Sequence, residues 1–335
     1  MPQTVNFSRE EFVGIRGRLA PSPTGFIHIG NAWAFLLAWL SVRSEHGTVV
    51  LRMEDIDPDR SRLEYEEGIV DDLKWLGLDW DEGPDCGGAY GPYRQSERFA
   101  IYESSIARLD SESKVYPCFC TRKELKSLAS APHAADYGPM YPGTCGGLSL
   151  CERKGLIKQG RRASLRMRSG DSRITFDDAI YGAQSFSPEE WGGDFAIRRS
   201  DGVFAYQLAV VVDDAAMNIN QVVRGEDILH CTPRQLIIYA ALGEHPPQYA
   251  HVPLVVDAEG ERLAKRHRHY ELRMLRERGV KAEALIGYLG WCAGLQPSCK
   301  PKAAYDFVAG FSFDKLPTHN IVLESDVIES LIRNS

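Results

Sequence analysis

The residues from Arg18 to Gly30 are of types that could bind a nucleotide. They read Arg-Leu-Ala-Pro-Ser-Pro-Thr-Gly-Phe-Ile-His-Ile-Gly and lead into an apolar run, Ala32–Leu40. Glycines at positions 25 and 30 would let a phosphate or an adenine ring approach the backbone, where a Cβ would block it. The N–H groups of a helix start favour phosphate, and the imidazole of His28 adds a donor. The pattern indicates a nucleotide site, although a lone His-x-Gly also fits a turn that feeds a buried helix.

Acidic residues follow a second segment that reads as a buried strand, Gly47–Met53. Glu54 comes directly after it, in the run Glu-Asp-Ile-Asp-Pro. In α/β sheets, ligand-binding groups gather at the carboxyl ends of strands, beside a crevice. These carboxylates are therefore candidates for a ligand site. A strand that simply runs into a polar loop is the alternative.

Alternating strand and helix patterns predict an α/β sheet that would position these residues. A short strand is expected at 18–20, and Leu208–Val212, apolar on both faces, is predicted to be a central parallel strand. Arg224 would lie at a strand end, as part of a structural ion pair or as an anion clamp. Helices are predicted to begin at His28 and to cover 64–76, 97–109, 273–290 and, in one or two pieces, 311–332.

Three of the eight cysteines are spaced as metal ligands could be. One residue separates Cys118 from Cys120, and Cys145 follows on a Gly- and Pro-rich loop. Such thiolates can hold tetrahedral zinc, whereas three buried cysteines in a loop-rich insertion are the alternative. The surrounding segment, about 115 to 168, also carries basic residues that either contact RNA or form a solvated face. They are Arg153, Lys154, Lys158, Arg161, Arg162, Arg166 and Arg168.

Length and composition are those of an ordinary globular protein. The 335 residues allow two or three domains, and 44% hydrophobic with 25% charged residues is a typical balance. The net charge of −7 argues against a protein that coats nucleic acids without sequence preference. The run Ala32–Leu40 is too short to cross a bilayer, and the N-terminus lacks the apolar stretch of a signal peptide. We therefore expect a cytoplasmic protein without membrane contact, whose cysteines are thiols or metal ligands.

The motifs resemble those of the class I aminoacyl-tRNA synthetases, and of their glutamyl and glutaminyl branch in particular. Pro-Ser-Pro-Thr-Gly-x-x-His-x-Gly is similar to the first signature of the family, with Asn31 where its final histidine would stand. The second signature takes the form Arg-Leu-Ala-Lys-Arg at 262–266, which retains Lys265 but has Ala264 in place of the usual serine. Three further blocks resemble the family, beginning at Arg52, Tyr93 and Arg224.

The resemblance implies a site for glutamate and ATP. The glutamate set would be Arg18, Ser22, Glu54, Tyr206 and Arg224. The ATP set would be His28, Gly30 and Lys265, with His28 and Lys265 catalytic and Mg²⁺ accompanying ATP. Glu54 would bind the substrate ammonium, and Arg18 and Arg224 the two carboxylates. Two arginines and one carboxylate fit glutamate better than glutamine or a neutral amino acid.

The pattern Cys-x-Cys…Tyr-x-x-x-Cys is similar to the zinc site of the glutamyl-queuosine tRNA(Asp) synthetases, the short members of this branch. There a tyrosine oxygen is the fourth ligand. The implied ligands of one structural Zn²⁺ are Cys118, Cys120, Tyr141 and Cys145. Because phenolate is an uncommon ligand, Cys151 and His133 remain alternatives for the fourth position.

The resemblance also implies a fold and a division into domains. The fold would be α/β, with a Rossmann-like class I catalytic domain in two halves, 1–110 and 191–270. A zinc-binding insertion would occupy 111–190, and a small helical domain 271–335. The residues after Leu289 are too few for an anticodon-binding domain, which favours the short branch.

The implied activity is tRNA-independent activation of L-glutamate with ATP, followed by transfer of glutamate to the queuosine base in the anticodon loop of tRNA(Asp). We expect a monomer. Two alternatives remain. One is a glutamyl-tRNA synthetase shortened at its C-terminus that charges the 3′ end of tRNA, and the other is a non-catalytic paralogue that binds RNA.

Overall fold

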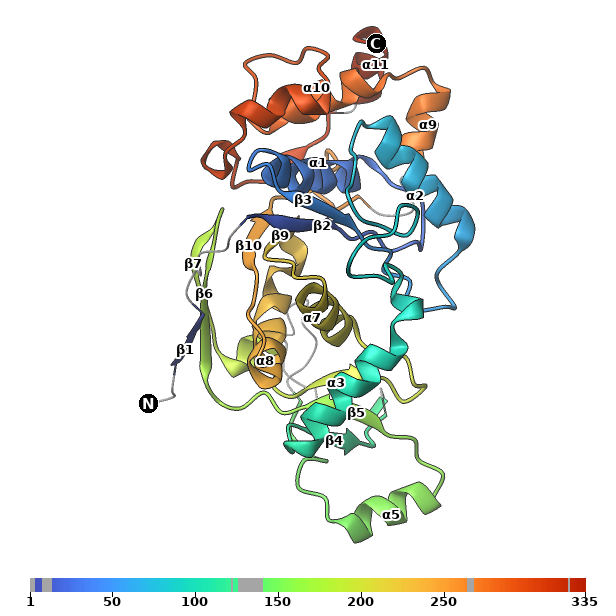
Figure 1. The fold of residues 1–335 in the computed structure, drawn as a ribbon, viewed down its shortest axis with the longest axis vertical. Helices are drawn as coiled ribbons and strands as arrows, with labels where there is room; N and C mark the ends of the chain where they lie inside the picture. The colour runs from blue at the N-terminus through green and yellow to red at the C-terminus, as the bar shows by residue number, and fades with distance from the viewer. Residues whose placement is uncertain (1–3, 8–13, 122, 126–140, 264–267, 325) are drawn as a thin grey trace.

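The computed structural model describes residues 4–7, 14–121, 123–125, 141–263, 268–324 and 326–335 (Figure 1). Within them, a seven-stranded sheet has the order β1-β6-β10-β9-β2-β3, with β7 paired to β6. Neighbouring strands are parallel except β6 and β7. The strands are β1 (Thr4–Phe7), β2 (Arg16–Leu19), β3 (Thr48–Leu51), β6 (Arg173–Asp178), β7 (Gly182–Phe186), β9 (Gln221–Gly225) and β10 (Gln248–Val252).

The order of the strands reverses at β2. From β2 the chain continues to β3 on one side, whereas the strand on its other side, β9, comes about 200 residues later in the sequence. In open α/β sheets, ligands bind in the crevice outside the carboxyl ends of strands at such a point. Arg18, Glu54 and Arg224 all lie at or just beyond those carboxyl ends. The topology therefore places the three predicted site residues at one edge of the sheet.

Two hydrophobic cores cover the two faces of this sheet. On β9, Val222 belongs to one core and Val223 to the other, because successive side chains of a strand point to opposite faces. One core forms around α1 (Ile29–Arg43), which packs against β2, β3 and β9, and it continues into α10 (Ala282–Cys292). The other core lies between the sheet and the helices α3 (Phe99–Ser111), α7 (Tyr206–Ala216) and α8 (Thr232–Leu242) (Figure 1). The α/β class predicted from the sequence is confirmed.

The three helices predicted to begin at His28 and to cover 64–76 and 97–109 are present. Besides α1, α3, α7, α8 and α10, the helices of four or more residues are α2 (Leu63–Trp75), α5 (Leu150–Lys158), α6 (Pro188–Trp191), α9 (Leu272–Glu277) and α11 (Val327–Arg333). Of the helices within the described residues, none is long and apolar enough to cross a membrane.

The prediction of a central strand at Leu208–Val212 is wrong, because this run lies within α7. A short apolar run is compatible with a buried strand or a buried helix, and periodicity alone does not distinguish them. Here the helix is buried on nearly all sides, and even Gln207, Asp213 and Asp214 are buried. The central strand in this part of the chain is instead β9.

The helix predicted over 273–290 is two helices, α9 and α10. Gly279, with a φ of 87°, separates them, and an L-residue with a side chain rarely adopts that conformation. The prediction of one or two helices over 311–332 is only partly correct. That segment contains a 3₁₀ turn (Phe313–Lys315), the short strand β12 (Ile321–Val322), which pairs with β11 (Val255–Val256), and most of α11.

The segment that carries Cys118 and Cys120 contributes two strands to a separate antiparallel sheet. Its strands are β4 (Val115–Cys118), β5 (Ser164–Met167) and β8 (Phe195–Arg198), in the order β4-β5-β8. The helix α5 projects beyond this sheet at the end of the molecule opposite α10 and α11 (Figure 1). The cysteine segment thus lies away from the core of the main sheet.

Candidate functional site

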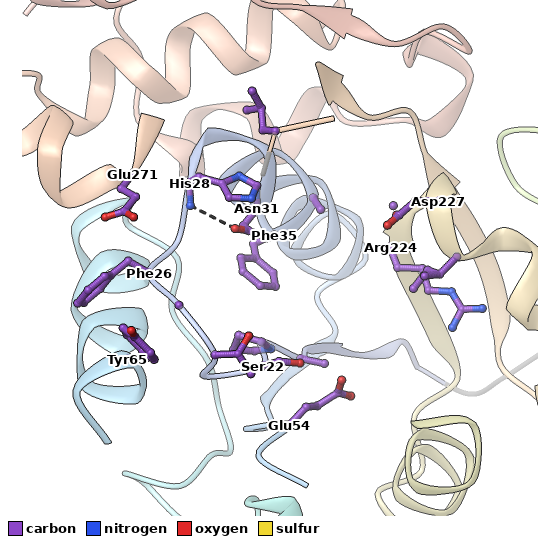
Figure 2. Close-up of a pocket in the computed structure, with 18 of the residues that line it drawn as sticks. Ser22, Phe26, His28, Asn31, Phe35, Glu54, Tyr65, Arg224, Asp227 and Glu271 are labelled. Atoms are coloured by element: carbon purple, nitrogen blue, oxygen red, sulfur yellow. Dashed lines mark hydrogen bonds between the residues drawn. The ribbon is translucent and has the colours of Figure 1, made fainter. Parts of the chain in front are cut away.

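A pocket of about 980 Å³ opens at the carboxyl ends of β2 and β9 (Figure 2). Six predicted site residues line it: Arg18, Ser22, His28, Glu54, Tyr206 and Arg224. Gly30 is not among the lining residues, and Lys265 and Ala264 lie outside the described residues. The structure therefore brings together residues that are up to about 200 positions apart in the sequence.

His28 is the N-cap of α1, and Asn31 completes a capping box with it. The backbone N–H of Asn31 donates to Nδ1 of His28 at 3.3 Å, and the N–H of His28 donates to the side-chain oxygen of Asn31 at 3.2 Å. Because Nδ1 accepts, the neutral imidazole carries its proton on Nε2. His28 therefore offers a donor at the start of a helix, where an anion is favoured. Asn31, which departs from the family signature, orients this histidine.

Gly30 acts through the imidazole rather than by lining the pocket. A Cβ at this position would lie 3.1 Å from Cε1 and 3.2 Å from Nδ1 of His28, and 3.8 Å from a methyl group of Leu263. Such distances are too short for an ordinary Cβ contact with the ring. Glycine therefore leaves room for the ring in its capping position.

A buried network of charges forms the floor beside Glu54. Arg52, fully buried, donates from Nη2 to Glu54 Oε1 at 3.0 Å and from Nη1 to Asp214 Oδ1 at 2.7 Å. Arg18 contacts the same oxygen of Asp214 through Nε at 3.6 Å. Burial raises the pKa of the Glu54 carboxyl, and the positive charges of Arg52 and Arg18 oppose that shift. Asp214 therefore contacts both Arg18, which belongs to the predicted glutamate set, and Arg52, which holds Glu54.

A second set of buried side chains, around Asp213, holds this network in place. Asp213, the neighbour of Asp214 on α7, accepts from Arg98 Nε at 2.6 Å and from the hydroxyl of Tyr102 at 2.9 Å. Gln95 donates to the same carboxylate at 2.9 Å. Sequence reasoning missed this set. The pair of acidic residues that ends the apolar run of α7 was the available signal.

Arg224 is surrounded differently from Arg18. It is buried, and its three donor contacts go to Nε2 of His251 at 3.0 Å, Oε1 of Gln235 at 2.8 Å and Oγ1 of Thr232 at 2.8 Å. All three acceptors are neutral. Among the ion pairs of the described residues, none joins Arg224 to a carboxylate. Such a buried cation suits an anionic ligand.

The rest of the pocket wall comes from several distant segments of the chain. Arg262, in the first position of the second signature, pairs with Asp227 at 2.5 Å, and both residues line the pocket. On the opposite wall, Phe26 lies edge-on to Tyr65, with 4.9 Å between the ring centroids (Figure 2). The guanidinium carbon of Arg273 lies 3.7 Å from the ring centroid of Phe26. Neither Asp227 nor the Phe26 wall was predicted from the sequence.

The predicted metal ligands also lie close together. The thiol sulfurs of Cys118, Cys120 and Cys145 lie within 4.8 Å of one another, with 3.6 Å between the last two. The hydroxyl of Tyr141 is 3.3 Å from the sulfur of Cys118 and 3.8 Å from that of Cys120. Three sulfurs and one oxygen at such separations fit the donor set of a tetrahedral zinc ion. Burial and the thiol of Cys145 raise the pKa of Cys120 to about 12. At Cys118 the effect of burial is outweighed by hydrogen bonds from Tyr141 and Arg166, which lower its pKa.

One of the two alternatives for the fourth ligand, Cys151, does not belong to this cluster. It is exposed on α5, and the other alternative, His133, falls outside the described residues. Arg166 lies over the ring of Tyr141, with 3.8 Å from its guanidinium carbon to the ring centroid. Its Nη1 also donates to the backbone oxygen of Asp194 at 2.8 Å. One member of the basic run therefore supports the tyrosine instead of lying on a solvated face.

The chain is similar to known tRNA synthetases. The family model for the catalytic domain of class I tRNA synthetases (E and Q) matches residues 14–308. A glutamyl-Q tRNA(Asp) synthetase of Nitratidesulfovibrio vulgaris is 58% identical over 95% of this chain and 98% of its own length. A glutamate–tRNA ligase 2 of Syntrophus aciditrophicus is 42% identical over 93% of this chain and 64% of its own length. A solved glutamate-tRNA synthetase from Elizabethkingia anophelis superposes with a TM-score of 0.82 at 27% identity, covering 95% of this chain and 69% of that one.

Proposed function

The chain belongs to the glutamyl and glutaminyl branch of the class I tRNA synthetases, and we propose that it activates L-glutamate with ATP and transfers it to the queuosine base of tRNA(Asp). Identity of 58% across nearly the full length of a glutamyl-Q tRNA(Asp) synthetase supports this choice over charging of a tRNA 3′ end. Identity to the glutamate–tRNA ligase is 42%.

One observation supports glutamate as the substrate: the charges that line the pocket. Arg18 and Arg224 supply two guanidinium groups, and Glu54 supplies one carboxylate. Glutamate carries two carboxylates and one ammonium, so each of its charges finds an opposite partner. Arg224, whose protein partners are all neutral, is the better candidate for the side-chain carboxylate. Glutamine would leave this buried cation without an anion.

In the first step, an oxygen of the glutamate α-carboxylate attacks the α-phosphorus of ATP. A new O–P bond forms, the bond from the α-phosphorus to the bridging oxygen breaks, and pyrophosphate leaves. Mg²⁺ bound with ATP would offset the negative charge of the phosphates. The enzyme supplies alignment and stabilisation of charge, so no protein nucleophile is needed. We assign a donor role to His28 at the helix start. Lys265 would stabilise the departing pyrophosphate.

In the second step, a hydroxyl oxygen of the queuosine ring attacks the carbonyl carbon of glutamyl-adenylate. An ester bond forms, the bond from the carbonyl carbon to the phosphate oxygen breaks, and AMP leaves. The hydroxyl proton passes to the phosphate or to water. Cys118, Cys120, Tyr141 and Cys145 would hold a zinc ion that orders the insertion 111–190, and we assign to this insertion the steering of the RNA. The ion itself takes no part in the chemistry.

Glutamate-dependent exchange of pyrophosphate into ATP, measured with and without tRNA, tests the first step. Exchange without tRNA is the result that we expect, with glutamine giving little. A strict need for tRNA would favour the second candidate, a glutamyl-tRNA synthetase. The 42% identity to a glutamate–tRNA ligase is the observation that supports this candidate. An absence of exchange under both conditions would contradict the activation of glutamate altogether.

A further inference from the structure

Three neighbouring strands carry one continuous chain of side-chain contacts that ends at the pocket. Arg224 on β9 is directly paired in register with His251 on β10, and Asp178 at the end of β6 lies beside β10 in turn. The Nε–H of Arg224 donates to Nε2 of His251 at 3.0 Å, and Nδ1 of His251 lies 2.6 Å from Oδ2 of Asp178. His251 and Asp178 are buried and do not line the pocket.

The roles of donor and acceptor along this chain are fixed by chemistry. An arginine has donors only, so Nε2 of His251 must accept. The neutral ring then carries its proton on Nδ1 and donates it to Asp178. Burial lowers the pKa of His251 to about 4, which keeps the ring neutral near pH 7. In the other tautomer, or in the protonated ring, an N–H would point at the N–H of Arg224.

Asp178 is held as an acceptor on both oxygens. Its Oδ1 accepts from the backbone N–H groups of Ile180 and Tyr181, each at 3.0 Å. Its Oδ2 accepts from the backbone N–H of His251 at 3.1 Å as well as from the ring. Within the described part of the chain, each hydrogen-bond partner of this carboxylate is a donor, and an amide nitrogen in place of either oxygen would meet an N–H group.

We propose that Asp178 and His251 are positioning residues that orient the guanidinium of Arg224 toward the substrate carboxylate. The inference rests on the proposed function, in which Arg224 binds that carboxylate. Arginine has five N–H groups, and His251, Gln235 and Thr232 accept three of them. The ring of Tyr249, whose centroid lies 5.1 Å from the guanidinium carbon, supports one face. Among the hydrogen bonds that the described residues make, two N–H groups are left for the ligand, which matches a bidentate carboxylate.

Two substitutions at position 251 separate orientation from mere packing. His251→Leu removes the acceptor, whereas His251→Gln offers an amide oxygen to Arg224 and an amide N–H to Asp178. With the purified full chain, the KM for glutamate in pyrophosphate exchange should rise roughly 10- to 100-fold in His251→Leu, as expected for loss of a hydrogen bond to a charged group. The KM for ATP should stay within about threefold, and His251→Gln should recover most of the loss.

Asp178→Asn tests the far end of the chain, with Asp72→Asn as the matched control. Asp72 is also a buried carboxylate, but its partner is Arg276 on α9. We expect Asp178→Asn to raise the KM for glutamate and Asp72→Asn to leave it unchanged, with thermal melting reporting the fold of each. If His251→Leu has the wild-type KM for glutamate, or if His251→Gln is as impaired as His251→Leu, the inference is wrong. If the wild-type protein shows no glutamate-dependent exchange, the proposed function itself fails.

Discussion

The substrate pocket and the cysteine cluster are both polar sites, but they are assembled in opposite ways. The pocket takes its charges from segments as distant as Arg18 and Arg224, which only the sheet brings together. The cluster takes all its donors from the 28 residues between Cys118 and Cys145. In the floor of the pocket, Arg52 lies between Asp214 and Glu54, so much of the charge is already paired within the protein. The cluster instead brings three thiols together, with the cation Arg166 beside Cys118, and a bound metal ion would pair with all three.

This difference indicates what each site needs in order to form. The floor of the pocket is electrostatically satisfied by the protein, and its geometry depends on the fold of the main sheet. The thiols of the cluster become good ligands only as thiolates, and binding of a metal then contributes to local folding. We therefore expect changes in the pocket to alter activity with little effect on folding. Changes in the cluster should alter the insertion with little effect on glutamate activation.

The largest effect should follow from Arg224→Met, which removes the guanidinium without adding a polar group. The substrate carboxylate then loses two charge-assisted hydrogen bonds, and kcat/KM for glutamate should fall roughly 100- to 10,000-fold, at about 1.5–3 kcal/mol for each bond. Pyrophosphate exchange with glutamate as the varied substrate is the measurement. A fall of less than fivefold would contradict the assignment of Arg224 to the substrate carboxylate.

Lys265→Ala should act on the rate and not on binding. If Lys265 stabilises charge that develops on the departing pyrophosphate, the rate of glutamyl-adenylate formation should fall about 100-fold. The dissociation constant for glutamate should hardly change, because the contact belongs to the transition state. Single-turnover formation of adenylate measures the rate, and calorimetric titration measures the binding. Equal activity in the variant would refute this role.

Cys145→Ser tests the cysteine cluster, with Cys151→Ser as a control because Cys151 is exposed and outside the cluster. Loss of one thiolate should lower bound zinc, measured by elemental analysis, from about one equivalent per chain to near zero. The insertion should then become sensitive to limited proteolysis, while glutamate-dependent exchange stays within about threefold. A loss of exchange as large as that of Arg224→Met would break the distinction between the two sites.

The smallest effect should be a change in how stability depends on pH. His251 has a pKa of about 4 in the folded state against 6.5 ordinarily, so the unfolded chain binds the proton more readily. This group contributes stability above pH 6.5 that is lost as the pH falls toward 4. Asp72, whose pKa is raised to about 6, makes the opposite contribution, because below pH 6 it adds stability as the pH falls. Its contribution is the same in the wild type and in His251→Gln, so it cancels when the two are compared.

His251→Gln should therefore lose less stability than the wild type on acidification. The difference should reach about 1 kcal/mol between pH 7.5 and pH 5.5, since one pKa unit corresponds to 1.36 kcal/mol. Urea unfolding at several pH values gives the free energies. Parallel pH profiles for the two proteins would contradict a neutral His251 in the folded state.

Local sequence signals predicted the parts of the pocket that depend on short segments. The strand before Glu54 and the helix that has His28 as its N-cap both follow from residues within a few positions. The contacts of Arg224 do not follow from residues nearby in the sequence. Asp178 and His251 are 73 residues apart, and only the register of β6, β10 and β9 places them in one row. The run Leu208–Val212 was misassigned because burial on all sides removes the periodicity that distinguishes a helix from a strand.

The central claim is that glutamate is transferred to queuosine, and the location of labelled glutamate on tRNA(Asp) tests it most directly. The protein, ATP and radioactive glutamate are incubated with queuosine-containing tRNA(Asp) and with the same tRNA lacking queuosine. Nuclease digestion then separates the anticodon fragment from the 3′ end. We predict label in the anticodon fragment of the queuosine-containing tRNA alone. Label at the 3′ end, or label that does not depend on queuosine, would contradict the claim.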